Sequence, residues 1–231
     1  SGGGQLSGTG ILDVSGSTWG LGGVFEKSNG TLTISETTDL ALSGNSTLTS
    51  DEALSFVNLE LNDFTLTLGS LNSDLTVQNA ITIDTSTESI LTGEADLTVE
   101  GDFTLANGKL ESTSGKLIFS NGVTQSGSSV FDLGASDLTV EGDVTLANNG
   151  KLKSTSGTLI FRNGVTQSGS FEFDLGASDL TVEGDFTLAN GKLESTSGEL
   201  IFRKGVTQSG SSVFDLGASD LTVEGDVTLA N

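Results

Sequence analysis

The sequence contains no cysteine, histidine, proline, methionine or tyrosine, and it has a single tryptophan, Trp19. Without cysteine the chain forms no disulfide, offers no thiolate to a metal and performs no thiol catalysis. Without histidine it lacks the side chain that most often serves as general base or metal ligand. These absences weigh against an enzyme, and we expect no catalytic or cofactor-binding residues.

Basic residues are also scarce. The 231 residues include 9 lysines and arginines against 31 aspartates and glutamates, a net charge of −22. Such a surface does not favour nucleic acid or anionic membranes, because both need basic patches. No apolar run approaches the roughly 20 residues of a membrane-spanning helix, and the start, Ser1-Gly-Gly-Gly, does not resemble a signal peptide. This composition is typical of secreted or surface proteins, so we expect an extracellular or cell-surface location.

What the sequence does contain is repetition. Residues 96–136 and 179–219 differ at three of their 41 positions, a third copy spans 137–178 with one inserted asparagine, and a fourth begins at Asp220. Repetition at a fixed period is the signature of a stacked array. We therefore divide the chain into divergent N-terminal rungs, 1–95, and near-identical repeats, 96–231. Because the last repeat stops midway, we expect the chain to be a segment of a longer protein.

Each 41-residue repeat consists of two related halves. One half, the A rung, reads DLTVEGDFTLANGKLESTSG, and the other, the B rung, reads KLIFSNGVTQSGSSVFDLGAS. A rungs begin at Asp96, Asp137, Asp179 and Asp220, and B rungs begin at Lys116, Thr158 and Glu199. Weaker copies open at Thr31, Ala53 and Asp74. The structural period is therefore about 20–21 residues, and the chain holds about ten rungs.

The local pattern within a rung is that of strands. Apolar residues alternate with Thr, Asp, Glu or Ser over three to five positions, as in 171–175, and Gly, Asn and Ser mark the turns between them. Three short strands per rung predict an all-β parallel β-helix, a right-handed solenoid that climbs one strand spacing per turn. The alternative is an array of β-sandwiches, which we rank lower because a sandwich usually takes about 100 residues.

Aligned rungs predict three inward columns of apolar side chains. The columns are Leu97, Leu117, Leu138, Leu159, Leu180, Leu200 and Leu221; Val99, Phe119, Val140, Phe161, Val182, Phe202 and Val223; and Phe103, Val123, Val144, Val165, Phe186, Val206 and Val227. The second column alternates a smaller residue with a larger one, which lets successive layers pack densely.

One outward column consists entirely of threonine. It contains Thr82, Thr104, Thr124, Thr145, Thr166, Thr187, Thr207 and Thr228. The simplest interpretation is structural, because β-branched threonine suits an exposed pleat and stacked hydroxyls can form hydrogen bonds along the sheet. The functional alternative is a repetitive glycan- or ice-binding face, formed by Thr104, Thr124, Thr145, Thr166, Thr187 and Thr207. The neighbouring outward column alternates Thr with Ile, so it does not widen this face into a flat threonine surface.

Two further outward columns carry charge. One is predicted to form a ladder of ion pairs that holds the register, through Glu141, Arg162, Glu183, Arg203 and Glu224. In the other, an aspartate recurs in the Glu-Gly-Asp turn of every A rung, at Asp102, Asp143, Asp185 and Asp226. We interpret these aspartates mainly as turn residues, with weak calcium binding as the alternative, because no EF-hand or calcium-binding nonapeptide motif is present.

No enzyme motif accompanies these columns. The chain has no nucleophile elbow with a histidine partner, no phosphate-binding lysine loop and no dinucleotide turn, and its short turns predict no cleft for a glycosidase or lyase.

Phrases such as Gly157-Thr-Leu-Ile-Phe and Gly164-Val-Thr-Gln-Ser-Gly resemble the repeat regions of large bacterial surface and secreted β-helix proteins, such as filamentous-haemagglutinin-like exoproteins, autotransporter passengers and giant adhesins. The resemblance covers nearly the whole chain, by texture rather than by invariant residues. It implies a structural or adhesive module in a rod, stalk or filament. Because an uncovered end rung presents unpaired N–H and C=O groups, we expect the partners to be end-to-end copies or further rungs of the same chain, with a glycan or cell-surface ligand as a further candidate.

Overall fold

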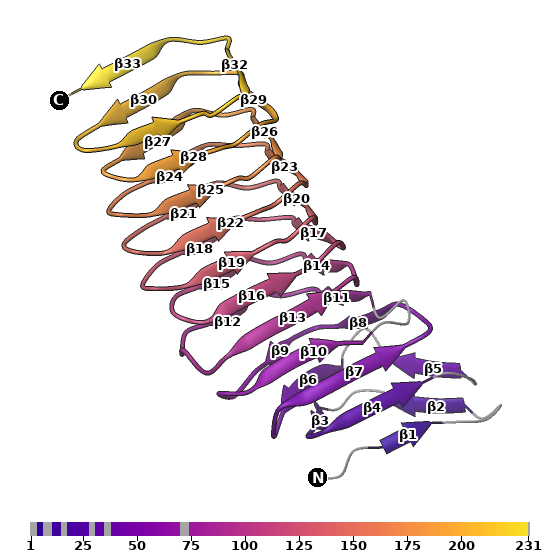
Figure 1. Cartoon of the computed structure of the whole chain (residues 1–231). Helices are drawn as coiled ribbons and strands as arrows, with labels where there is room; N and C mark the ends of the chain where they lie inside the picture. The colour runs from indigo at the N-terminus through magenta and orange to yellow at the C-terminus, as the bar shows by residue number, and fades with distance from the viewer. Residues whose placement is uncertain are drawn as a thin grey trace.

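The computed structural model describes residues 4–6, 11–14, 18–27, 31–34, 38–69 and 74–230. These residues form strands and turns but no helix, and they wind into a right-handed parallel solenoid of about nine turns, with about 21 residues and three strands per turn (Figure 1). The predicted parallel β-helix is confirmed, and the count of turns is close to the ten expected. The β-sandwich alternative is wrong, because the sheets run along the stack and neighbouring strands in them are parallel.

Three long sheets line the sides of the solenoid. The first sheet contains β8 (Leu54–Phe56), β11 (Leu75–Val77), β14 (Leu97–Val99), β17 (Lys116–Phe119), β20 (Asp137–Val140), β23 (Thr158–Phe161), β26 (Asp179–Val182), β29 (Glu199–Phe202) and β32 (Asp220–Val223). The second sheet contains β12 (Ile81–Ile83), β15 (Phe103–Leu105), β18 (Val123–Gln125), β21 (Val144–Leu146), β24 (Val165–Gln167), β27 (Phe186–Ala189), β30 (Val206–Ser209) and β33 (Val227–Ala230).

The third sheet reaches furthest toward the N-terminus. It contains β1 (Gly4–Leu6), β4 (Val24–Lys27), β7 (Ser46–Ser50), β10 (Thr65–Leu68), β13 (Ser89–Gly93), β16 (Lys109–Ser112), β19 (Val130–Asp132), β22 (Lys151–Lys153), β25 (Glu172–Asp174), β28 (Lys192–Glu194) and β31 (Val213–Asp215). Two short sheets complete the N-terminal turns, one of β2 (Ile11–Val14) and β5 (Thr31–Ile34), the other of β3 (Thr18–Leu21), β6 (Asp39–Leu42) and β9 (Leu59–Glu60).

The divergent rungs and the near-identical repeats belong to one continuous stack. Across the boundary at residue 95, β11 pairs with β14, β12 with β15 and β13 with β16. The third pairing contains a register shift between Leu91 and Gly93, which absorbs a difference in strand length. From β14 to β32 the first sheet then keeps a single register.

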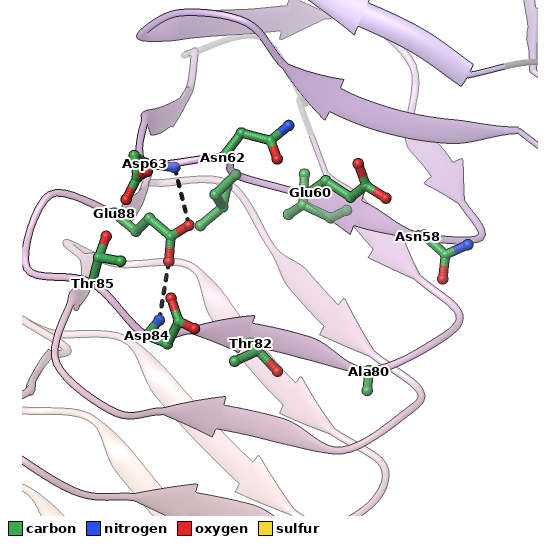
Figure 2. Close-up of a pocket in the computed structure, with 11 residues that line it drawn as sticks. Asn58, Glu60, Asn62, Asp63, Ala80, Thr82, Asp84, Thr85 and Glu88 are labelled. Atoms are coloured by element: carbon green, nitrogen blue, oxygen red, sulfur yellow. Dashed lines mark hydrogen bonds between the residues drawn. The ribbon is translucent and has the colours of Figure 1, made fainter.

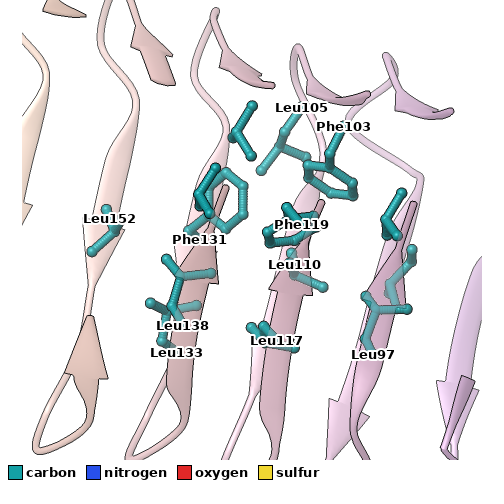
Figure 3. Close-up of a cluster of buried hydrophobic side chains, with 14 of the residues drawn as sticks. Leu97, Phe103, Leu105, Leu110, Leu117, Phe119, Phe131, Leu133, Leu138 and Leu152 are labelled. Carbon is teal, nitrogen blue, oxygen red and sulfur yellow. The ribbon is translucent and has the colours of Figure 1, made fainter. Parts of the chain in front are cut away.

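The predicted inward columns form the core up to residue 206, and their register is confirmed along the stack, although Leu221 and Val227 of the last rung are exposed. Leu97, Leu117 and Phe119 are fully buried, and Phe103, Phe119 and Phe131 gather from three strands in one cluster (Figure 3). The ring centroids of Phe103 and Phe119 lie 4.6 Å apart in a tilted contact. Burial of one such side chain stabilises the fold by about 1.5–3 kcal/mol, so the stacked columns supply most of the free energy that stabilises the solenoid.

Polar residues also enter the interior, at positions where no apolar column was predicted. Gln125 and Gln167 are fully buried in the second sheet, where the A rungs carry leucine. At the corner before the first sheet, the hydroxyls of Ser154 and Ser178 lie 2.6 Å apart, and the equivalent pair Ser112–Ser136 has the same spacing. These hydrogen bonds allow polar groups to be buried where the chain turns inward.

Glycine is required where successive turns of backbone meet. A Cβ atom on Gly184, in a Glu-Gly-Asp turn, would lie 2.4 Å from the backbone carbon of Asn163 in the rung below. Gly134 adopts a φ of 55°, which favours glycine, and its Cβ would lie 2.8 Å from the carbonyl oxygen of Ser112. The glycines of the repeat therefore permit the close approach of one rung to the next.

Candidate interaction surfaces

The threonine column runs along the outer surface of the second sheet. Eight threonines, from Thr82 to Thr228, pair in register across eight strands. Thr124, Thr145 and Thr166 are exposed, and the residues before and after each of them are buried. This is the alternation of a β-strand, in which successive side chains point to opposite faces of the sheet. The surface beside this column is formed by small residues such as Ala147 and Ser168. The result is a narrow row of hydroxyls at the strand spacing of about 4.8 Å.

The charge ladder lies at the end of the strands of the first sheet. Arg162 bridges two rungs, because its Nε donates to Glu141 Oε1 at 3.2 Å and its Nη1 donates to Glu183 Oε1 at 2.8 Å. Arg203 Nη1 donates to Glu224 Oε1 at 2.9 Å. These side chains are about one third to one half exposed, so each pair contributes at most about 1 kcal/mol. The ion pairs therefore join Glu141, Arg162 and Glu183 in one group and Arg203 and Glu224 in another, and an effect on register stays a prediction.

The turn aspartates bind backbone of the same protein. The Oδ1 atoms of Asp102, Asp143 and Asp185 accept hydrogen bonds from glycine N–H groups of the next rung, at 3.3, 3.3 and 3.0 Å. No group of three or more acidic residues that could hold a metal ion occurs among the described residues. The four calcium candidates, Asp226 included, therefore lie at turns, and calcium binding there stays a prediction.

A second column of aspartates has the same role, which the sequence reasoning missed. Asp96, Asp137 and Asp179 open the A rungs, and each Oδ1 accepts the N–H of the residue that opens the next B rung, at 2.7, 2.9 and 2.8 Å. The signal was available, because an aspartate opens every complete copy of the A rung. The A rungs that open at Asp96, Asp137 and Asp179 therefore each carry two carboxylates that bind the backbone of the following B rung.

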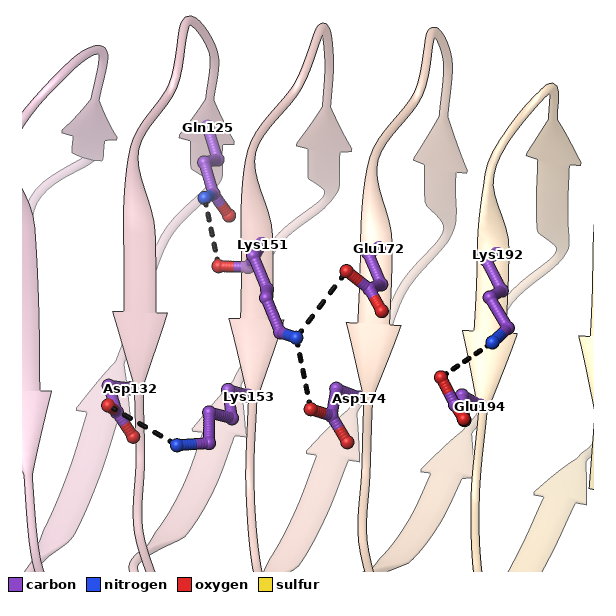
Figure 4. A network of polar contacts seen from close by, with 8 residues as sticks. All are labelled: Gln125, Asp132, Lys151, Lys153, Glu172, Asp174, Lys192 and Glu194. Atoms are coloured by element: carbon purple, nitrogen blue, oxygen red, sulfur yellow. Dashed lines mark hydrogen bonds and ion pairs between the residues drawn. The ribbon is translucent and has the colours of Figure 1, made fainter. Parts of the chain in front are cut away.

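The outer surface of the third sheet carries a further set of ion pairs that sequence reasoning also missed (Figure 4). Lys151 Nζ lies 3.0 Å from Asp174 Oδ2 and 3.4 Å from Glu172 Oε2, one rung above. Lys153 Nζ reaches in the opposite direction, 3.9 Å from Asp132 Oδ2. The two lysines of β22 therefore join three consecutive strands.

These contacts shift the pKa of two lysines. Burial lowers the pKa of Lys151, but the hydrogen bonds and charges of Asp174 and Glu172 outweigh burial and raise the pKa above its usual value of 10.5. The hydrogen bond from Lys192 to Glu194, 2.7 Å long, raises the pKa of Lys192. Both lysines stay charged at neutral pH, so this surface presents paired charges to solvent.

A hollow of about 420 Å³ interrupts the divergent rungs, which corrects the expectation that the chain has no cleft (Figure 2). Four carboxylates line it, those of Glu60, Asp63, Asp84 and Glu88. It forms beside a turn in which Asn62 and Asp63 have φ values of 51° and 68°. A left-handed turn at two non-glycine residues is uncommon and was not foreseeable from the strand pattern.

Glu88 holds the two sides of this hollow together. It is buried, its Oε1 accepts the N–H of Asp63 at 3.1 Å, and its Oε2 accepts the N–H of Asp84 at 3.0 Å. Both carboxylate oxygens are therefore engaged by backbone. This arrangement is that of a structural carboxylate.

The fold defines a class, the parallel β-solenoids built from repeated rungs. No family model, curated protein or solved structure matches the chain. None of the described residues forms a helix long and apolar enough to cross a membrane.

Proposed function

We propose that this chain is a structural and adhesive module, a rigid segment of a rod, stalk or filament in a longer repetitive surface protein. The observation that carries the proposal is the unbroken register of the first sheet from β14 to β32. Backbone hydrogen bonds and buried columns bind successive rungs, and ion pairs add to several of the contacts between rungs. About nine turns at about 4.8 Å each make a segment about 43 Å long.

Rigidity follows from how the rungs contact each other. Every side of the solenoid is a hydrogen-bonded sheet, so bending would stretch one ladder while compressing the others. The buried phenylalanines add contacts between layers, as in the pair Phe186 and Phe202 with ring centroids 4.8 Å apart. A stiff rod can hold other parts of a protein at a fixed distance, and its repeated surface can attach to a partner at many points.

The extracellular location and adhesive role are supported by composition and by the resemblance to bacterial surface repeats. The acidic, cysteine-free chain needs no disulfides, because its stability comes from stacking. Two measurements test the proposal. Small-angle scattering of the isolated chain should give the distance distribution of a rod, and antibodies against residues 96–231 should label intact cells that express the full protein. A compact distance distribution, or labelling only after cell lysis, would contradict it.

A second candidate function is binding of a glycan or of ice along the threonine column. The in-register, exposed hydroxyls of Thr124, Thr145 and Thr166 favour it. The double variant Thr145→Lys and Thr166→Lys should abolish binding in glycan-array and ice-recrystallisation assays while leaving the circular dichroism spectrum unchanged. Thr139→Lys with Thr181→Lys, on the first sheet, is the matched control. Equal binding by both variants would refute this candidate.

We propose no enzymatic activity for the acidic hollow, although a β-helix carbohydrate-active enzyme would place its acidic pair in such a groove. Depolymerisation assays on acidic and neutral glycans should be silent. Activity that disappears in Glu60→Gln or Asp84→Asn would overturn this expectation and make the hollow an active site.

A further inference from the structure

The outer surface of the first sheet carries a row in which threonine alternates with isoleucine. The row has one residue per rung, in register from strand to strand: Thr98, Ile118, Thr139, Ile160, Thr181 and Ile201. Ile118 is 37% exposed, and the other five are partly exposed. Ile118, Thr139 and Ile160 also line a surface hollow of about 310 Å³. Isoleucine side chains therefore project from this sheet about every 9.6 Å, with a smaller side chain between them.

Charged residues flank this row on both sides. On one side, successive rungs carry Asp96, Lys116, Asp137, Thr158, Asp179 and Glu199; on the other, they carry Glu100, Ser120, Glu141, Arg162, Glu183 and Arg203. These positions alternate with buried leucine, valine and phenylalanine, so they lie on the outer surface. Each of the three A rungs thus presents two acids beside its threonine, whereas each B rung presents a lysine or an arginine beside its isoleucine.

Two copies of this surface fit each other when the solenoid axes run in opposite directions. A twofold axis along the strands, between the rungs that open at Asp137 and Thr158, sets each A rung of one copy opposite a B rung of the other. A small side chain then meets a large one in every rung, in the pairs Thr139–Ile160, Ile118–Thr181 and Thr98–Ile201. The two rows therefore interlock.

The flanking charges are complementary in the same arrangement. Opposite charges face each other in the pairs Glu141–Arg162, Lys116–Asp179 and Glu100–Arg203, and the twofold axis makes each pair occur twice. The side chains of Glu141, Arg162 and Arg203 are nearly half exposed, so they can bind a second partner besides the one within the chain. Two like-charge pairs, Asp96–Glu199 and Asp74–Asp220, lie toward the outer ends of the contact, where solvent screens them.

Other arrangements lose this match. A slide of one rung sets A rungs against A rungs, so that Asp faces Asp and Glu faces Glu, and like charges directly opposite are destabilising. Parallel copies related by a twofold axis along the solenoid would set Asp137 against Glu141 and isoleucine against isoleucine. A slide of two rungs restores the facing of A and B rungs. The match therefore selects antiparallel copies, in steps of one 41-residue repeat.

We propose that the first sheet binds a second copy of this chain, side by side and antiparallel, through the threonine–isoleucine row and its flanking charges. Six strands by five residues give facing surfaces of about 29 by 16 Å, or about 900 Å² in total. An interface of this size is at the weak, transient end of specific contacts. The inference goes beyond the proposed rod, because it concerns the contact between two rods.

The first test uses the native chain and a carbodiimide, which joins a lysine ammonium to a carboxylate in contact with it. Lys116 and Asp179 are three strands apart in one chain, about 14 Å, so an amide between them has to join two copies. Lys116 lies opposite Asp137 within its own chain, and that crosslink is the internal control. The reaction is run in about 0.15 M NaCl, which screens the repulsion between two acidic chains beyond about 8 Å.

Mass spectrometry of the covalent dimer should find Lys116 joined to Asp179, or to Asp220 after a slide of two rungs. If the control crosslink forms and neither of these does, the proposal is wrong.

The second test compares two double variants by sedimentation velocity over a range of protein concentrations. Ile118→Glu with Ile160→Glu puts carboxylates into the row and should weaken dimerisation by about tenfold or more. Ser126→Glu with Ser168→Glu adds the same charge to the same two rungs, beside the second sheet, and should leave dimerisation unchanged. Circular dichroism checks that both variants keep the fold. Equal dimerisation of the two variants, or a native chain that stays monomeric, would overturn the proposal.

The two proposals fail separately. If scattering of the dilute chain shows a rod but no crosslink joins two copies, the rod function stands and the side-by-side contact is wrong. If scattering shows a compact particle, the rod function is wrong, whatever the crosslinks show.

Discussion

The Nζ atom of Lys151 lies 3.0 Å from Oδ2 of Asp174. The two residues belong to β22 and β25, which are neighbours in the third sheet although β23 and β24 lie between them in the sequence. The pairing is diagonal, because Lys151 lies directly opposite Glu172 and reaches past it to Asp174. One lysine therefore compensates two acids of a chain that has an excess of negative charge. Figure 4 shows two further ion pairs on this sheet, Lys153–Asp132 between neighbouring strands and Lys192–Glu194 within one strand.

The first prediction concerns alkaline stability. Because the folded-state pKa of Lys151 is raised, its contribution is complete below the unfolded value of 10.5 and is lost as pH rises through the higher folded value. Lys151→Met should therefore lower stability at neutral pH by up to about 1 kcal/mol, with a smaller loss above pH 10.5. Urea denaturation across this range measures the difference. Lys116→Met, on the exposed surface of the first sheet, is the control, and an identical pH profile for both would contradict the prediction.

The second prediction concerns the charge ladder. Arg162→Glu would place a third glutamate between Glu141 and Glu183 and should destabilise the chain by about 1 kcal/mol at low salt. Arg162→Gln should cost less, because it removes attraction without adding repulsion. In ~1 M NaCl, where the screening length is about 3 Å, the difference between the two variants should largely disappear. A salt-independent difference in Tm would show that packing, not charge, is responsible.

The third prediction concerns backbone approach at the Glu-Gly-Asp turn. Gly184→Ala should destabilise by about 1–3 kcal/mol, because its Cβ would meet the backbone of Asn163 and Gly164 at 2.4 Å. Gly164→Ala is the matched control, since its Cβ would have no contact closer than 3.6 Å. The control should change stability by less than about 0.5 kcal/mol. Similar midpoints of urea denaturation for the two variants would refute the steric argument.

The fourth prediction compares two buried glutamines. Gln167 Oε1 accepts the N–H of Ala189 at 2.8 Å, whereas Gln125 Oε1 is buried without a hydrogen-bond partner. Leucine occupies this column in the A rungs, so Gln125→Leu keeps the volume and removes an unsatisfied acceptor. Gln167→Leu should be more destabilising than Gln125→Leu by about 1 kcal/mol, measured by thermal denaturation. The reverse order would contradict the assignment.

Much of the fold could be predicted because its information is local and repeated. Alternation of apolar and polar residues determines which side chains face inward, and the 20–21-residue period determines which of them stack, as in Leu97 over Leu117. The threonine column and the Glu–Arg ladder follow from the same two periods. They were predictable because strand residues return at the period of the coil.

The contacts at the corners and on the third sheet could not be predicted from these two periods. Ser154 and Ser178 are 24 residues apart, not 21, because the chain turns between strands and the partner belongs to a different point of the next coil. The strands of the third sheet vary in sequence, so the diagonal pair Lys151–Asp174 was not visible as a column. The hollow beside Glu88 depends on a left-handed turn at Asn62 and Asp63, which breaks the pattern.

The sequence by itself determined the parallel solenoid, its period and its inward columns, because period-2 burial and a fixed repeat leave few other ways to bury the same leucines and phenylalanines. Only the tertiary structure decided which polar groups meet between rungs. Aspartate carboxylates accept N–H groups at the A-to-B step, and this contact depends on the height and tilt of one coil over the next. These carboxylate-to-N–H distances depend on how all three sheets pack together. The sequence of one strand alone therefore does not determine them.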